Sequence, residues 1–340
     1  MIGAEYFMKL IHCADIHLDS PMETHMTTEQ ASMRNTEIIH SFIRMTEYAK
    51  KNEVRVVIIA GDLFDGERIR TRTVDEILDA IRSTPSVDYL YLAGNHDESS
   101  HAFSNHDLPQ NLKQFNRKWN SYVYEDVMIS GIEICDENAT SLYLNIPHRD
   151  GCVNIISLHG QVGTTCGIDQ INLNLLKNQG IDYLALGHLH SYSVHSLDNK
   201  GIYCYSGCLE GRGFDECDKK GFVLLTVESG RLQHEFVPFC CRQLHQVDVD
   251  ITGLTKNSEI GQMMKSAVQG IQPDDMVEFI LTGYSDPTAN IAVSYLQNLI
   301  NNSFFFTKVK NESRMAINPE DYKNDISMKG EFIRWVLDSD

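Results

Sequence analysis

Residues 54–65 read VRVVIIAGDLFD, and this stretch decides the class of fold. Its first seven residues form a continuous run rich in β-branched side chains, which predicts a strand covered on both faces. Gly61, Asp62 and Asp65 follow this run. Ligands of open α/β sheets bind beyond the carboxyl ends of the strands. The stretch therefore predicts an α/β core with a polar site at the end of this strand.

Segments on both sides of this stretch have the same alternating character. Further buried apolar runs, which predict strands, are residues 8–13, 87–93, 153–158 and 183–186. Residues 32–52 and 74–81 place apolar side chains at helical spacing. Residues 99–121 are polar and irregular, and we expect a long loop with some helix there. Alternating strands and helices indicate an α/β core.

The alternation of strands and helices gives way to consecutive predicted strands in the second half of the chain. Residues 221–228 and 231–237 flank Ser229-Gly230 and predict a hairpin, so part of the sheet is expected to be antiparallel. A second, smaller α/β series follows, with strands expected at residues 245–251, 276–281 and 304–309 and helices at residues 260–271, 289–300 and 326–337. Two domains are also the expectation for 340 residues at about 150 residues per domain.

The composition limits the classes of function. The formal net charge is −18, with 42% hydrophobic and 22% charged residues, which is ordinary for a folded protein. We expect neither a secretory signal nor a membrane span, because the N-terminus lacks the required charge pattern and no apolar run reaches about 18 residues. Nine cysteines without a CxxC pair fit free thiols in a reducing cytoplasm. The acidic charge argues against a general electrostatic nucleic-acid binder, but it allows a nuclease whose positive charge is local or supplied by metal.

Five short polar motifs directly follow predicted strands. They are Asp15-Ile16-His17, Gly61-Asp62-Leu63-Phe64-Asp65, Gly94-Asn95-His96-Asp97, His159-Gly160 and Gly187-His188-Leu189-His190. We expect them to converge at one edge of the sheet. Imidazole and carboxylate ligands together suit Mn, Fe or Zn, whereas all-oxygen sites suit Mg or Ca. One such motif is usually a plain turn, but five in order indicate a site for two metals.

The spacing within the motifs suggests how ions would be held. Asp15 and His17 would point the same way in an extended segment and hold one ion. His188 and His190 have the same spacing, although in a loop they could serve two different ions. Asp62 has two carboxylate oxygens and could bridge both metals. The glycines that precede the ligands allow sharp turns and close approach of the backbone.

Two metals separated by about 3.5–4 Å suit the hydrolysis of phosphate esters. Together they clamp the ester, generate a hydroxide and stabilise the charge that develops in the displacement. Asn95 offers a neutral oxygen ligand, and His96 follows it at the edge of the site. His96 could donate a proton to the leaving oxygen. Asp65 could orient His96 and keep it protonated.

These motifs resemble the signature of the calcineurin-like metallophosphoesterases. The strings IHCADIHLDSP, IIAGDLFD, LAGNHDE, SLHGQ and LALGHLH are most similar to the SbcD and YhaO branch, which includes the nuclease subunit of the archaeal and eukaryotic double-strand-break repair complex. YSGCLEGRGFDECDKKGF resembles the strand–loop–Lys-Gly element of that branch, and FVPFCCRQLHQVDVDITG resembles its entry to a capping domain. The resemblance covers about residues 8–255.

The resemblance implies a fold and a set of site residues. The fold is an α/β two-sheet sandwich flanked by helices (αββα), with a metallophosphoesterase domain over residues 8–240 and a small α/β capping domain over residues 241–340. His96 would be the catalytic histidine, with Asp65 as its partner. The first metal would be held by Asp15, His17, Asp62 and His190, and the second by Asp62, Asn95, His159 and His188.

The resemblance also implies an activity, which is Mn²⁺-dependent exonuclease or endonuclease action in DNA break repair, with Fe²⁺ or Zn²⁺ as alternative metals. Implied partners are DNA, an SbcC-like coiled-coil ATPase, for which residues 326–337 are the available segment, and a second copy of the chain. Two other functions stay open. The chain could be a small-molecule phosphatase or phosphodiesterase, which its acidic charge favours, or a non-catalytic, metal-bound scaffold for the ATPase.

Four arginines are candidate phosphate or DNA contacts. Arg68, Arg70 and Arg72 alternate after the second motif and, if extended, would face one way. The alternative for these three is a solvated start of a helix. Arg212 lies in a glycine-rich loop that could border the site.

Overall fold

The computed structural model describes residues 7–22, 26–66, 69–97, 102–286, 289–316 and 322–337. The chain divides into two compact units, Met1–Gln243 and Leu244–Asp340. Residues 241–243 therefore belong to the first unit, whereas the sequence placed the boundary between residues 240 and 241. No helix within the described ranges is both long and apolar enough to cross a lipid bilayer.

The first unit contains two six-stranded sheets. The first sheet has the order β14-β13-β1-β2-β3-β4. Its parallel strands are β1 (Phe7–Cys13), β2 (Val54–Ala60), β3 (Asp88–Leu92) and β4 (Leu112–Gln114). The predicted hairpin is confirmed, because β13 (Gly221–Glu228) and β14 (Arg231–Pro238) pair antiparallel from Glu228 opposite Arg231. This hairpin joins the sheet through β1.

The second sheet has the order β11-β12-β10-β7-β6-β5. Its strands are β5 (Asn120–Tyr124), β6 (Val127–Gly131), β7 (Val153–His159), β10 (Tyr183–Gly187), β11 (Ser193–Ser196) and β12 (Ile202–Tyr205). The four inner strands β12, β10, β7 and β6 are parallel, and the two outer strands are antiparallel to their neighbours. The parallel strands therefore end at one edge of this sheet too.

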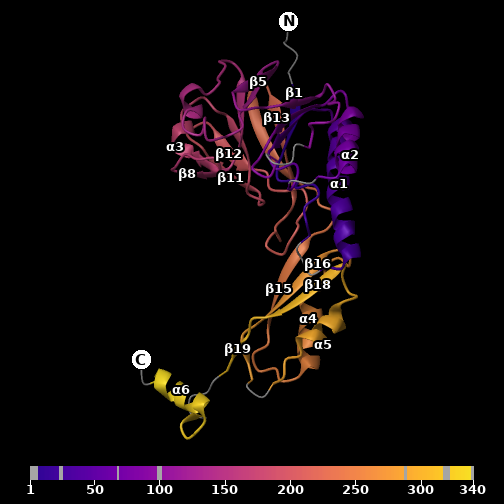
Figure 1. Cartoon of the computed structure of the whole chain (residues 1–340), viewed down its shortest axis with the longest axis vertical. Coiled ribbons are helices and arrows are strands. Elements are labelled where there is room, and N and C mark those ends of the chain that lie inside the picture. Colours follow the sequence, from indigo (N-terminus) through magenta and orange to yellow (C-terminus); the bar gives the residue numbers. More distant parts are fainter. Residues whose placement is uncertain are drawn as a thin grey trace. The chain divides into compact units, whose positions relative to one another are not determined.

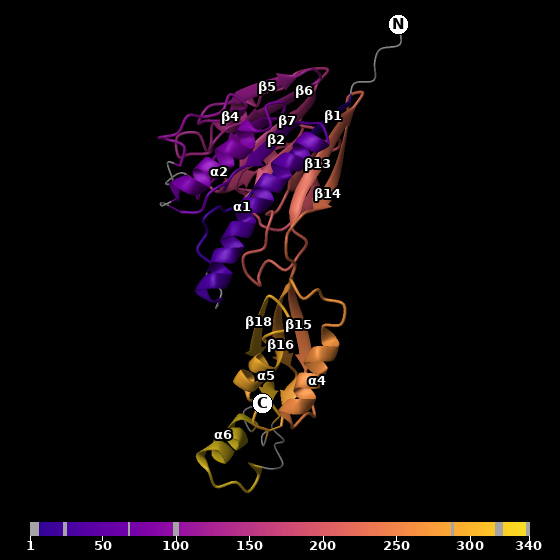
Figure 2. The ribbon, with the colours of Figure 1, turned by 90° about the vertical axis from the view of Figure 1, so that its right-hand side faces the viewer.

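Three layers of apolar side chains hold the first unit together. One core lies between the sheets, where Val56 and Leu90 of the first sheet pack with Ile155 of the second. α1 (Thr28–Lys51) and α2 (Thr71–Arg82) cover the outer face of the first sheet (Figures 1 and 2). The outer face of the second sheet packs against the short helices η1 (Leu142–Asn145) and α3 (Leu173–Leu176). The predicted α/β two-sheet sandwich flanked by helices is confirmed.

The prediction of some helix within residues 99–121 is wrong for the part that the structure describes, residues 102–121. This part holds β4 and the start of β5, joined by irregular chain. The β5–β6 hairpin was not predicted. Its strands have five residues each, and Val123 remains 46% exposed, so the alternation is weak. The turn between them uses Glu125 in the left-handed region, with φ 51°, rather than a glycine.

The chain between β7 and β10 contains a separate two-stranded sheet. β8 (Gln161–Gly163) and β9 (Gln170–Asn172) form a short parallel pair that immediately precedes α3.

The second unit is a three-stranded parallel sheet with the order β15-β16-β18. Its strands are β15 (Leu244–Asp250), β16 (Met276–Thr282) and β18 (Phe306–Asn311). α4 (Asn257–Ala267) and α5 (Val293–Ile300) pack on one face, where Met264 and Leu296 meet Phe279. β17 (Tyr284–Ser285), β19 (Arg314–Met315) and α6 (Met328–Leu337) complete the unit.

Candidate metal centre

The predicted ligand residues lie at the carboxyl ends of five parallel strands. β1, β2 and β3 of the first sheet are followed by Asp15, Asp62 and Asn95. In the second sheet, β7 ends at His159 and β10 is followed by His188. The sequence predicted that the motifs meet at the edge of a single sheet. The centre instead lies where the edges of two facing sheets meet.

The loops after β1 and β2 are tied to each other by backbone hydrogen bonds. Asp15 N–H donates to Gly61 O at 3.0 Å, and His17 N–H donates to Asp62 O at 3.0 Å. The backbone here is not extended, because Asp15 and His17 have φ values of 52° and 50°. The expected extended geometry was thus wrong, although both side chains reach one cluster. Left-handed backbone at non-glycine residues is costly and is typically retained at functional sites.

Two glycines are required by close packing of the loops. A Cβ at Gly61, which has φ 97°, would lie 2.0 Å from Nδ1 of His159. A Cβ at Gly94 would lie 2.2 Å from Oδ1 of Asp62. Any larger residue at either position would displace a ligand side chain.

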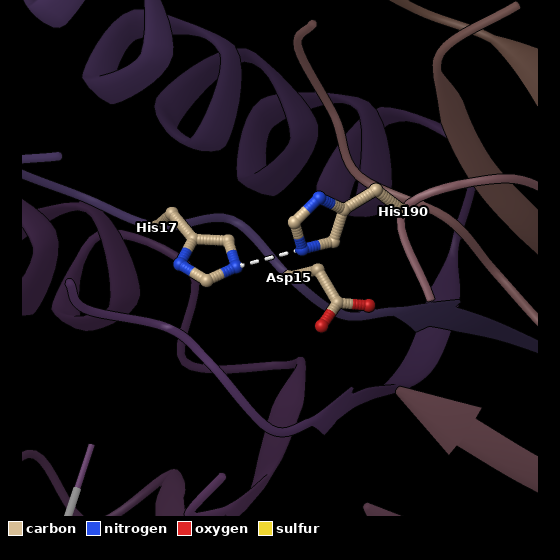
Figure 3. Close-up of side chains that lie close together, drawn as sticks. All are labelled: Asp15, His17 and His190. Carbon is tan, nitrogen blue, oxygen red and sulfur yellow. Dashed lines mark hydrogen bonds between the residues drawn. The ribbon is translucent and has the colours of Figure 1, made fainter. Parts of the chain in front are cut away.

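Asp15, His17 and His190 form the first cluster, shown in Figure 3. One ligand atom from each lies within 4.8 Å of the others, and the Nε2 atoms of His17 and His190 are 3.1 Å apart. Asp15 and His17 are completely buried. The backbone N–H of His188 donates to Oδ1 of Asp15 at 2.8 Å and so fixes this carboxylate.

The second cluster contains Asn95, His159 and His188. Oδ1 of Asn95 lies 3.0 Å from Nε2 of His159 and 3.4 Å from Nδ1 of His188. Asp62 lies between the two clusters, with Oδ2 at 3.3 Å from Nε2 of His159 and 3.8 Å from Nε2 of His17. This position matches the one that a bridging carboxylate needs. His188 and His190 thus point into different clusters, one of the two options that their spacing left open.

Hydrogen bonds outside the clusters orient two of the imidazoles. Nδ1 of His159 lies 2.9 Å from Ala60 O, and Nδ1 of His190 lies 2.7 Å from Oε1 of Glu216. Since a carbonyl or carboxylate accepts from Nδ1–H, each ring turns Nε2 toward its cluster. Such partners commonly fix the tautomer of a metal-ligating histidine.

The electrostatics of the centre favour cations. Burial raises the pKa of Asp15, and the charge of Asp62 adds to this effect. Burial also acts to raise the pKa of Asp62, but hydrogen bonding and charge from His159 lower it to about 2. Two neighbouring buried carboxylates and converging imidazole nitrogens form a donor set that fits divalent metal ions.

His96 and Asp65 form a pair at the rim. Nδ1 of His96 lies 2.8 Å from Oδ1 of Asp65, and the His96 side chain is 45% exposed. The hydrogen bond to Asp65 raises the pKa of His96. Burial opposes ionisation of Asp65, but the neighbouring imidazoles keep its pKa well below the usual range, with His17 Nδ1 at 3.7 Å from Oδ2 and His96 hydrogen-bonded to Oδ1. His96 can therefore present Nε2 outward while its other nitrogen is fixed.

Arg212 borders the centre, as the sequence suggested. Its Nη1 donates to Oδ2 of Asp65 at 3.1 Å, and its Nη2 lies 3.2 Å from Nδ1 of His190. Its backbone N–H donates to Oε2 of Glu216 at 2.9 Å. Its Nη2 also donates to Oε1 of Glu216 at 3.4 Å, so the guanidinium lies between the carboxylates of Asp65 and Glu216.

The other arginines lie in different surroundings. Arg70 precedes α2 and forms an ion pair with Asp19. Arg72 lies within α2 and pairs with Glu76 at 2.8 Å. Of the two options that the sequence left open for these arginines, the start of a helix is correct for Arg70 and Arg72, because α2 begins at Thr71. Arg68 lies outside the described residues.

Two residues that support the centre were not assigned a role from the sequence. Asp97, the last residue of GNHD, accepts backbone hydrogen bonds from Leu63, Phe64 and Gly94 at 3.2, 2.8 and 3.0 Å. It thereby ties the loop after β3 to the loop after β2. Glu216 had no recognisable signal, because its contact with His190 depends on how the loop after β12 returns to the centre.

A two-sheet α/β sandwich that gathers aspartate, asparagine and histidine at its strand ends is the architecture of a metal-dependent phosphoesterase. Residues 8–192 match the family model of the calcineurin-like phosphoesterases, and the chain belongs to this family. Family and donor set together imply divalent metals.

Two curated relatives indicate the branch of the family to which the chain is similar. An uncharacterized metallophosphoesterase, YhaO of Bacillus subtilis, is 26% identical over 76% of this chain and 67% of its own length. The DNA double-strand break repair protein Mre11 of Archaeoglobus fulgidus is 25% identical over 73% of this chain and 64% of its own length. The chain thus spans about two thirds of these relatives. These relatives agree with membership in the SbcD, YhaO and Mre11 branch.

Solved structures also align with the chain. A dimetal phosphatase from Danio rerio has a TM-score of 0.40 at 13% identity, over 68% of this chain and 99% of that one. TT1561 of Thermus thermophilus has a TM-score of 0.42 at 9% identity, with the same coverage.

Proposed function

We propose that this protein is a two-metal phosphodiesterase that acts on DNA, as an exonuclease or endonuclease in break repair. The observation that carries the proposal is the bridging position of Asp62 between two clusters, with the His96–Asp65 pair at their rim. Support for DNA comes from the relatives named as double-strand break repair proteins.

In this proposal, the first ion is held by Asp15, His17, Asp62 and His190, and the second by Asp62, Asn95, His159 and His188. When bound, two such ions, which we propose to be Mn²⁺, would clamp the phosphate and lower the pKa of water. The remaining contributions come from the chain's own side chains.

His96 is the proposed proton donor. Its outward-facing Nε2 donates a proton to the oxygen that leaves the phosphorus atom, while Asp65 holds Nδ1 and fixes the ring. Arg212, held by Asp65 and Glu216, supplies positive charge beside the phosphate oxygens. Local cations of this kind reconcile phosphate binding with the net charge of −18.

We further infer that the second unit, Leu244–Asp340, is a capping domain that controls access of DNA. An SbcC-like coiled-coil ATPase is the proposed partner, and α6 is the segment proposed to contact it, because Phe332 and Trp335 are 62% and 66% exposed. A homodimer and a cytoplasmic location complete the proposal. All nine cysteines are free thiols, which suits a reducing compartment.

The test is a nuclease assay with metal-free protein. End-labelled linear duplex and single-stranded DNA are incubated with added Mn²⁺ or Mg²⁺, beside an aryl phosphate diester and an aryl monoester. We expect Mn²⁺-dependent DNA degradation that is lost in Asp62→Ala and retained in Asp79→Ala, which removes an exposed carboxylate of α2.

A small-molecule phosphoesterase is the second candidate, and the acidic net charge favours it. Hydrolysis of the aryl esters with intact DNA would contradict the first proposal and support this one. Co-purification of an ATPase without hydrolysis of any substrate would instead support the non-catalytic scaffold.

A further inference from the structure

A cavity of about 340 Å³ lies beside the metal centre in the first unit. Its walls come from the end of β3, from the chain between residues 102 and 108, from β4 and from the start of the loop that follows β6. The side chains that give it its chemical character are Phe103, Gln114, Arg117 and Glu133. Its volume falls within the range of about 300–1,000 Å³ that small-molecule sites occupy.

The cavity is adjacent to the metal ligands. A much smaller cavity of about 20 Å³ is lined by Asn95 and His159, and it shares Ala93 and Glu133 with the larger one. A group attached to a phosphate at the metal centre can therefore extend past Ala93 into the larger space. Nothing in the chemistry assigned to the centre uses this space.

The lining excludes two kinds of occupant. Among the described residues that line it, Arg117 is the one Lys or Arg, and Asp97 and Glu133 are both acidic, so a second phosphate would meet these two acidic side chains. A purely apolar group is a poor match, because the exposed side chains of Gln114 and Arg117 and the half-buried side chain of Glu133 offer it polar surroundings. A neutral occupant with its own donors and acceptors remains.

The lining fits a flat heteroaromatic ring. Phe103 is half-buried, and its ring is held by edge contacts to Phe64 and Tyr91, with centroids 5.4 and 5.5 Å away. Bases stack on aromatic side chains that are fixed in this way. The amide of Gln114 both donates and accepts, Arg117 donates and Glu133 accepts, which are the groups that read the edges of bases.

We propose that this cavity binds the base of the nucleotide next to the scissile phosphate, and so selects nucleic acid over simple phosphate esters. The proposal rests on the proposed phosphodiesterase function and specifies its substrate class. The base leaves its stack, lies on Phe103 and forms hydrogen bonds with Gln114 and Arg117.

The experiment compares substrates that release the same 4-nitrophenolate. Methyl 4-nitrophenyl phosphate has no base, whereas the 4-nitrophenyl esters of thymidine 5′-phosphate and thymidine 3′-phosphate have one on either side. We expect kcat/KM for at least one thymidine ester to exceed that of the methyl ester by about tenfold or more, the size of one good base contact. Gln114→Ala and Arg117→Gln should each remove most of this preference and leave the methyl ester unchanged.

Gln233→Ala and Arg231→Gln, on the exposed side of β14, are matched controls. They should leave kcat/KM unchanged for both the methyl and the thymidine esters. A second measurement needs no metal, namely saturation-transfer NMR of the metal-free protein with the four deoxynucleosides. We expect transfer to base protons of at least one nucleoside, weakened by Gln114→Ala and not by Gln233→Ala.

Equal kcat/KM for the methyl ester and both thymidine esters would overturn the base site, as would variants that lower all esters by the same factor. These results are distinguishable from a failure of the proposed function. If DNA is degraded without a thymidine preference, the nuclease stands and the base site fails. If a thymidine preference depends on Gln114 but DNA stays intact, the base site stands and DNA as substrate is wrong.

Discussion

At the scale of single residues, His96 offers the clearest separation of chemistry from metal binding. The imidazole of His96 bonds to Asp65 and is not a proposed metal ligand, and its contact with Asp62 is made by the backbone N–H, which alanine retains, so His96→Ala should keep the wild-type metal content although its ring packs against His17. We expect kcat for DNA, whose alkoxide leaving group needs this proton, to fall by about 10² or more, the usual contribution of a positioned acid. Metal analysis beside steady-state kinetics checks both parts. Normal turnover by the variant would rule out this role.

Glu216 gives a second prediction, this time about metal affinity. Its Oε1 accepts from Nδ1–H of His190, so Glu216→Gln weakens the fixed tautomer that turns Nε2 inward. Loss of such a partner typically costs about 10–100-fold in metal affinity. Isothermal titration of the metal-free protein with Mn²⁺ should show this loss.

The control for this titration is Glu235→Gln, on β14, where the side chain is exposed. It should bind Mn²⁺ as the wild type does. Unchanged affinity in Glu216→Gln would mean that His190 is oriented by packing alone.

These two residues show why one part of the site could be predicted from the sequence and another could not. Ligands such as Asp62 and His188 directly follow buried strands, and parallel topology brings strand ends together, so their proximity follows from local pattern. Glu216 reaches His190 across 26 residues through a loop without periodicity. Arg212 was suggested only because its loop is rich in glycine, and its position between two carboxylates depends on the same loop.

At the scale of elements, long buried strands were predictable and short half-exposed ones were not. β2 (VRVVIIA) and β10 (YLALG) are apolar runs or nearly so, and β7 (VNIISLH) has a central apolar pair, Ile155-Ile156, so their sequence alone identified them. The β5–β6 hairpin has short strands with an exposed Val123, and its turn lacks glycine, so neither periodicity nor turn residues revealed it. For Arg72 the sequence left an extended segment and a helix start open, because α2 begins earlier than its apolar residues indicate.

β16, the central strand of the second unit, yields a prediction about pH. The buried carboxylate of Glu278 accepts from Gln246 of β15 at 2.9 Å and from Lys310 of β18 at 3.1 Å, and Lys308 lies 3.2 Å away. Burial acts to raise the pKa of Glu278, but hydrogen bonds from these partners lower it overall. A carboxyl whose folded-state pKa is lowered stabilises the fold above its unfolded pKa of about 4.3 and loses that effect as pH falls further.

Glu278→Gln should therefore destabilise the second unit by about 2 kcal/mol at pH 7, and the difference from wild type should shrink below about pH 4. Urea unfolding followed by pulsed hydrogen exchange at residues 276–282 measures this locally. Glu312→Gln, at an exposed position directly after β18, is the control and should show no such pH dependence. A difference that stays constant from pH 7 to pH 3 would contradict the assignment.

At the scale of the whole molecule, every predicted metal ligand lies in the first unit, since the boundary falls after Gln243. The ligands come from strand ends of both sheets, and buried carboxylates such as Asp15 and Asp62 oppose each other until a cation is present. Bound metal should therefore link the strand ends of the two sheets and stabilise the first unit. Among the described residues of the second unit, we assign none as a metal ligand.

We therefore expect Mn²⁺ to stabilise the two units unequally. At a free concentration of about 100 times Kd, linkage predicts about 2.7 kcal/mol for the first unit. Hydrogen exchange should slow in β2, β7 and the loops that follow them, while β15, β16 and β18 exchange as in the metal-free protein. Asp62→Asn should abolish the effect, because Asp62 is the residue that contacts both clusters. Equal protection of both units would instead mean that metal binding is transmitted into the second unit, and the two could then no longer be treated as energetically separate.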